Sequence, residues 1–125
     1  MNVEPINPNI TFNSRIKRLY KSGKIKLDYD IYGLPLNKNN VTDEHIICRC
    51  YGGSSEESNI ALATREINNL RGCKPIEQYV TIKMVAKYIE RLIDNNPPIV
   101  DGYNLIEYCN GILKTFQKIF KIGEK

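Results

Sequence analysis

The second half of the chain carries apolar residues at helical spacing, and a short polar, proline-rich segment divides that pattern in two. Over residues 75–95 the apolar positions recur every three or four residues, which is typical of a helix with one buried face. The sequence Asn-Asn-Pro-Pro at 95–98 ends this helix, because proline lacks the amide hydrogen that a helix interior needs. A second striped helix is expected over residues 103–120. We expect both stripes to face a common core, with a dimer interface as the alternative.

The first half of the chain predicts shorter elements. Ser14 is a typical N-cap residue and predicts a helix over residues 15–21 that ends near Gly23. Residues 24–32 alternate between apolar and charged side chains and predict a half-buried strand, and residues 41–47 predict another. Good helix formers over 61–70 predict a helix. The two strands are expected to form a hairpin-like pair that leads into this helix.

The length of 125 residues fits one domain, and a composition of 42% hydrophobic and 26% charged residues argues against disorder. The net charge of +4 suits a polyanionic partner. Basic residues concentrate within residues 1–27, where we expect an extended arm over 1–13 and a basic helix that contacts DNA phosphates through Arg15, Lys17 and Arg18. No leader sequence or membrane-spanning apolar run is recognised, so we expect a cytoplasmic protein without a membrane partner.

Residues 44–72 hold the side chains that most directly suggest a chemistry. His45 is the sole histidine of the sequence, Glu44 precedes it, and Asn59 and Asn68 follow. Hydrolysis of a phosphodiester needs an activated water and positive charge near the phosphate. A neutral imidazole is a suitable base, and carboxylate and amide oxygens are ligands that hard divalent cations prefer. His45, Glu44 and Asn68 would therefore suffice for a metal-assisted hydrolase.

This stretch resembles the HNH nucleases, the ββα-metal family. The matching motifs are Glu44-His45, Gly52-Gly53, Asn59, Asn68 and Arg71-Gly72, and the resemblance covers roughly residues 29–79.

The resemblance implies a role for each of these residues. His45 would be the general base, and Asn59 would hold the adjoining loop and support His45. Glu44 and Asn68 would bind one divalent ion, Mg²⁺ or Mn²⁺. The candidate phosphate contacts in this region are Arg49, Arg65, Arg71 and Lys74.

The sequence departs from the family at its cysteines. The Cys-x-x-Cys pairs that bind a structural zinc in many relatives are replaced by Tyr29, Tyr32, Thr64 and Ile67, so no structural zinc is expected. The cysteines present are Cys48, Cys50, Cys73 and Cys109. Free thiols are the favoured interpretation, and a metal site built from the first three is the alternative.

Together these patterns predict an α+β protein: a ββα-metal (HNH) core with a basic N-terminal arm and two C-terminal helices. The single domain would comprise the arm at 1–27, the core at about 29–79 and a helical extension at 80–125.

The predicted function is that of a phage or homing-type endonuclease that nicks double-stranded DNA as a monomer, with a homodimer or a phage protein as further partners. The alternatives are a nucleic-acid-binding module that does not cleave and an unrelated helical interaction protein. In the last case Glu44 and Asn68 would lie more than roughly 8 Å apart, because metal–oxygen bonds are only about 2.0–2.6 Å long.

Overall fold

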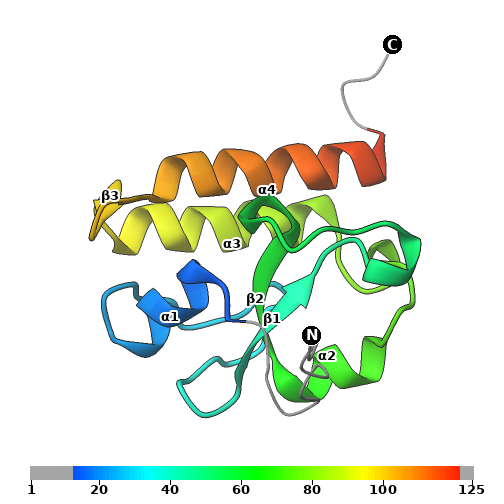
Figure 1. Ribbon diagram of the computed structural model, residues 1–125, viewed down its shortest axis with the longest axis horizontal. Helices are drawn as coiled ribbons and strands as arrows, with labels where there is room; N and C mark the ends of the chain where they lie inside the picture. Colours follow the sequence, from blue (N-terminus) through cyan, green and yellow to red (C-terminus); the bar gives the residue numbers. More distant parts are fainter. Residues whose placement is uncertain (1–12, 122–125) are drawn as a thin grey trace, which may run out of the picture.

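The computed structural model describes residues 13–121. The extended segment expected over 1–13 therefore lies outside the described residues except for Asn13. The described part belongs to the mixed α+β class, with four α-helices and two small antiparallel sheets (Figure 1). In chain order the elements are α1 (Arg15–Lys21), β1 (Val41–His45), η1 (Arg49–Tyr51), η2 (Glu57–Asn59), β2 (Ile60–Thr64), α2 (Arg65–Arg71), η3 (Ile76–Gln78), α3 (Ile82–Asn95), β3 (Ile99–Val100), β4 (Tyr103–Asn104) and α4 (Leu105–Phe120).

The hairpin of β1 and β2 lies at the centre of the fold and leads directly into α2. The strands pair antiparallel, with Val41 opposite Thr64 and His45 opposite Ile60. Every residue of β2 is buried, and Thr64 serves as the N-cap position of α2 without a side-chain cap. A buried strand followed at once by a helix fixes α2 next to the end of β1, where the candidate site lies.

The outer edge of β2 is closed without a third strand. Leu62 N–H donates to the Tyr88 hydroxyl at 3.0 Å, and the Tyr108 hydroxyl donates to the Ile60 carbonyl at 2.7 Å. The two hydroxyls also lie 2.8 Å apart, within hydrogen-bond distance of each other. Further along the edge, Ile31 N–H donates to Leu62 O, and Asp30 accepts from Thr64 N–H. Side chains and a single loop residue thus satisfy buried backbone groups that would be costly to leave unpaired.

Helices α3 and α4 pack side by side over the hairpin (Figure 1). Their buried apolar residues belong to the main core, as the helical stripes predict. The short β3–β4 pair joins them through a turn at Asp101 and Gly102, both of which have positive φ. Helix α1 is fixed to β1 because the buried Asp43 carboxylate accepts from both the backbone N–H and the hydroxyl of Ser14.

Some boundaries follow the sequence closely. The helix over 15–21 is confirmed, with the Ser14 hydroxyl accepting from Lys17 N–H. Helix α3 ends at Asn95 as the Asn-Asn-Pro-Pro signal predicts, but it begins at Ile82 after a Thr81 N-cap, because Pro75 starts only a short 3₁₀ turn. The last helix begins at Leu105, since Tyr103 and Asn104 form β4.

The strand predicted over 24–32 is wrong, so β1 pairs with β2 and not with that segment, and the helix predicted over 61–70 is right only from residue 65. Residues 24–32 form no strand and make only an isolated bridge between Tyr29 and Pro35. Ile25 and Leu27 are buried as the alternation suggested, yet the chain turns at Asp30, whose side chain accepts backbone hydrogen bonds instead of leaving them to a sheet. The predicted helix over 61–70 is a strand up to Thr64, because pairing with β1 overrides the helix propensity of its alanines.

Among residues 13–121, no helix combines the length and apolar character that a bilayer crossing needs.

Replacing Tyr108 with Phe removes the hydroxyl that connects α4 to β2. We expect the free energy of unfolding to fall by about 1–3 kcal/mol, because the buried Ile60 carbonyl loses its donor. Urea denaturation measures the loss. Tyr51→Phe is the matched control, since Tyr51 is 68% exposed, and its effect should stay within about 0.5 kcal/mol. Equal stability of the two variants would show that the hydroxyl is dispensable.

Candidate functional site

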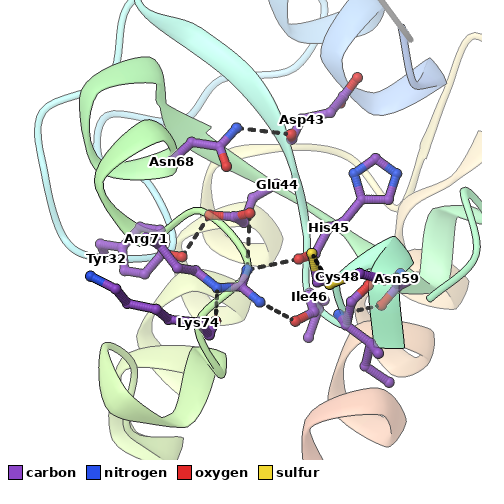
Figure 2. Close-up of polar contacts among 12 residues, drawn as sticks. Tyr32, Asp43, Glu44, His45, Ile46, Cys48, Asn59, Asn68, Arg71 and Lys74 are labelled. Atoms are coloured by element: carbon purple, nitrogen blue, oxygen red, sulfur yellow. Dashed lines mark hydrogen bonds and ion pairs between the residues drawn. The ribbon is translucent and has the colours of Figure 1, made fainter. Parts of the chain in front are cut away.

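A cavity of about 200 Å³ lies where the end of β1 meets α2 and the loop after β1. Its lining consists of Asp43, Glu44, His45, Cys48, Arg49, Asn68 and Gly72. The lining includes three residues that the sequence singled out for chemistry: Glu44 and His45 at the end of β1, and Asn68 on α2. Glu44 and Asn68 are in direct contact, whereas the His45 ring contacts Ser55. Figure 2 shows the side chains of Glu44, His45 and Asn68 around β1 and α2.

The Glu44 carboxylate is almost fully buried and already has partners. Its Oε1 lies 2.9 Å from Arg71 Nη1, and its Oε2 accepts from the Tyr32 hydroxyl at 2.7 Å. Burial raises the pKa of Glu44 to about 7, against the opposite effects of the Tyr32 hydrogen bond and the Arg71 charge. The Tyr32 hydrogen bond and the Arg71 charge thus limit the rise, and with a pKa of about 7 the carboxylate changes its protonation state around neutral pH.

The Asn68 amide faces this carboxylate. The amide atom nearest to it lies 2.9 Å from Oε1 and 3.2 Å from Oε2. A nitrogen at that position would donate to Glu44, whereas an oxygen, as drawn in Figure 2, would repel the carboxylate unless a cation lay between them. In the second orientation Asn68 Nδ2 donates to the Asp43 carbonyl at 3.4 Å. The 2.9 Å between the Asn68 amide atom and Glu44 Oε1 is close to the distance between neighbouring oxygen ligands of an octahedral Mg²⁺, which is about 3.0 Å for Mg–O bonds of about 2.1 Å.

His45 is half-buried, and its ring lies on the opposite side of β1 from the Glu44 carboxylate (Figure 2). Ring atom Nε2 is 3.1 Å from the Ser55 hydroxyl, which also accepts from Arg49 at 2.6 Å. Burial, followed by the positive charge of Arg49, lowers the pKa of His45 below its ordinary value. The imidazole is therefore neutral near pH 7 and able to accept a proton.

Asn59 organises the loop that runs from the end of β1 to β2. Its Oδ1 accepts from Ile47 N–H at 2.8 Å, and its Nδ2 donates to Ile47 O and Ser54 O. Gly53 packs so closely that an added Cβ would lie 1.7 Å from the Ile47 carbonyl oxygen. The loop therefore requires glycine at this position and the Asn59 amide at its base, and it holds Ser55 next to the His45 ring.

The predicted phosphate contacts are dispersed over the surface. Arg49 is exposed and lines the cavity. Arg18, Arg65 and Lys74 are exposed elsewhere. Arg15 turns away toward the β3–β4 hairpin, where it donates to Asp101 O and lies over the Tyr103 ring.

Two residues expected at a DNA interface lie inside the protein instead. Lys17 is buried and lies 3.5 Å from the Asp43 carboxylate. Arg71 is 2% exposed and donates to the carbonyls of His45, Ile46 and Lys74 as well as to Glu44. This burial could not be predicted from the sequence, because a basic residue before glycine at a helix end is normally exposed.

Sequence reasoning also missed Tyr32 and Ser55 as neighbours of Glu44 and His45. Tyr32 is 12 positions from Glu44, and Ser55 is 10 positions from His45. Neither is one of the residues to which the motif resemblance assigned a role. The alternation over 24–32 placed the even-numbered positions on the polar face of the expected strand, so it gave no sign that Tyr32 is buried.

A cysteine cluster adjoins the cavity. The sulfurs of Cys48, Cys50 and Cys73 all lie within 4.8 Å of one another and could hold a metal ion. Hydrogen bonding with Cys73 lowers the pKa of Cys48 and raises that of Cys73 to about 12. Thiols are ligands for soft or borderline metals, so this cluster is not a magnesium or manganese site.

Comparisons of the chain with protein-family models, with curated proteins and with solved structures gave no match. The chemistry of the site is therefore inferred from its own residues.

Replacing Arg71 with Gln should leave the Glu44 carboxylate buried without its charged partner. We expect the free energy of unfolding to fall by about 3–5 kcal/mol, the usual cost of breaking a buried ion pair from one side. Chemical denaturation measures the change. Arg18→Gln is the control, because Arg18 is exposed, and it should shift stability by no more than about 0.5 kcal/mol. Similar small effects for both would contradict a structural role for Arg71.

Proposed function

We propose that this protein is a metal-dependent endonuclease of the HNH kind that hydrolyses a phosphodiester bond of double-stranded DNA. The observation that carries the proposal is the meeting of the Glu44 carboxylate and the Asn68 amide at 2.9 Å, in a cavity that also contains His45. The order of two antiparallel strands and a helix matches what the motif resemblance implies for a ββα-metal core.

The donor set at the cavity fits a hard divalent cation such as Mg²⁺ or Mn²⁺. Glu44 contributes carboxylate oxygen, and Asn68 contributes amide oxygen in one of its two orientations. Bound there, a divalent cation would supply positive charge to the scissile phosphate. Because Tyr32 and Arg71 hold the two Glu44 oxygens in place, the carboxylate needs no rearrangement of its side chain to face Asn68.

His45 supplies the base. Its lowered pKa favours the neutral ring, which is the form that can act as a base, and the residue lines the cavity. Ser55 and Asn59 are positioning residues: Ser55 contacts the ring, and Asn59 fixes the loop that carries Ser55. Arg49 is the side chain best placed to contact a phosphate oxygen beside the base.

One such site per chain cuts one strand per encounter, so a monomer would produce nicks. Arg49 at the cavity, with the exposed Arg18, Arg65 and Lys74 elsewhere on the surface, would hold the DNA backbone without reading its sequence.

The second candidate is a nucleic-acid-binding module that does not cleave. The engagement of both Glu44 oxygens by Tyr32 and Arg71 favours it, because these contacts compete with a cation for the carboxylate. Salt-sensitive DNA binding without cleavage under any divalent metal would support this second function and overturn the first.

Replacing His45 with Ala should reduce nicking of supercoiled plasmid in Mg²⁺ or Mn²⁺ by about 10²–10⁴-fold, the usual contribution of a general base. Asn68→Ala should also abolish detectable metal-dependent cleavage, because it removes a ligand oxygen. Asn69→Ala is the matched control: Asn69 is the next residue on α2 and is exposed away from the cavity, so it should nick at the wild-type rate. Equal nicking rates for the Asn68 and Asn69 variants would show that Asn68 is not part of the active site.

Replacing Asn68 with Asp distinguishes the two orientations of the amide. An aspartate would face Glu44 across about 3 Å, so the metal-free variant should melt at a lower temperature than wild type because like charges repel. Added Mn²⁺ should raise its melting temperature by more than it raises that of wild type, because binding to the folded state stabilises it. Thermal melts with and without Mn²⁺ measure both shifts. A variant that is destabilised but indifferent to Mn²⁺ would show that Asn68 only donates to Glu44.

A further inference from the structure

Three cysteines from two separate loops converge beside the candidate active site. Cys48 and Cys50 flank the start of η1, directly after β1, and Cys73 follows α2. The sulfurs of Cys48 and Cys50 lie 3.4 Å apart, and all three lie within 4.8 Å of one another. None of them belongs to the Cys-x-x-Cys positions of the nuclease resemblance, which hold Tyr29, Tyr32, Thr64 and Ile67.

The fold holds these loops together independently of the thiols. Arg71 donates from the end of α2 to the carbonyls of His45 and Ile46, just before Cys48. Gly72 then adopts a positive φ of 56°, which reverses the chain and directs Cys73 back toward Cys48. The convergence of the sulfurs thus follows from a buried arginine and one glycine, so it does not require a disulfide.

The spacing suits a thiolate metal centre. Sulfur ligands around a tetrahedral Zn²⁺ are about 3.8 Å apart for Zn–S bonds of about 2.3 Å. The Cys48 and Cys50 sulfurs are slightly closer than that at 3.4 Å, and the other pairs lie within 4.8 Å. Binding would release the proton of each of the three thiols to solvent and leave a net charge of −1 on the ion and its ligands.

We propose that Cys48, Cys50 and Cys73 form a binding site for a thiophilic divalent ion of the Zn²⁺ class. The fourth coordination position is left to water or to a ligand from outside the chain, because no other candidate ligand joins the cluster among residues 13–121. The ion would join the loop after β1 to the loop after α2. Since Cys48 also lines the cavity of His45 and Asn68, the site would hold the two walls of that cavity together. It does not depend on the proposed nuclease activity.

The test is a Co²⁺ titration of the full-length protein, reduced with a phosphine and freed of metal. Thiolate ligation gives a sulfur-to-cobalt charge-transfer band, and displacement by Zn²⁺ gives the zinc affinity. We expect one ion per chain for wild type, counted by native mass spectrometry. Cys50→Ser and Cys73→Ser should weaken Zn²⁺ binding by at least about 100-fold, since even second-shell partners are worth 10–100-fold.

Cys109→Ser is the matched control, because Cys109 is buried in α4 and lies outside the cluster, so it should bind like wild type. If Cys73→Ser fails to fold, Cys50→Ser carries the test, since Cys50 is exposed. The absence of a charge-transfer band in wild type would overturn the proposal. So would equal affinity of all four proteins, which would locate the bound metal elsewhere.

Discussion

The buried ion pair between Arg71 and Glu44 connects most parts of the site. One guanidinium at the end of α2 binds the carboxylate of β1 and the carbonyls of His45, Ile46 and Lys74. Two charges can be buried at this depth only because each is also hydrogen-bonded, Glu44 by Tyr32 and Arg71 by backbone oxygens. Helix α2, the end of β1 and the loop toward η3 therefore hold one another in place. The positions of Asn68 and Cys73, which lie on either side of Arg71, follow from this anchor.

Arg71 also limits how strongly Glu44 can bind the proposed cation. Arg71 is a permanent positive charge within 2.9 Å of the carboxylate proposed to bind a cation. It lowers the pKa of Glu44 relative to what burial alone would give, yet it weakens the attraction of the carboxylate for a second positive charge. Asn68 adds an oxygen without adding charge, so the carboxylate contributes all of the negative charge offered by these two ligands. The arrangement supports a weakly held, exchangeable ion better than a permanent one.

The sequence predicted the parts of the fold that depend on local signals. The Ser14 cap, the stop at Asn95 and the grouping of Glu44, His45 and Asn68 could all be obtained from residue type and spacing. The errors came where distant partners decide. Residues 61–64 are a strand because β1 lies beside them, and residues 24–32 are irregular because Asp30 accepts the hydrogen bonds that a strand would have made. The burial of Arg71 is of the same kind, since only the three-dimensional placement of three carbonyls makes an arginine acceptable in the core.

The hydroxyls of Tyr88 and Tyr108 at the outer edge of β2 have a consequence for self-association. An exposed strand edge offers unpaired amides and carbonyls to any other extended chain, and this is a common route to fibrils and domain-swapped aggregates. Here the hydroxyls occupy that edge, and two helices shield it. A two-stranded sheet with an entirely buried strand can therefore remain two-stranded at high protein concentration, because a foreign strand would first have to displace both helices.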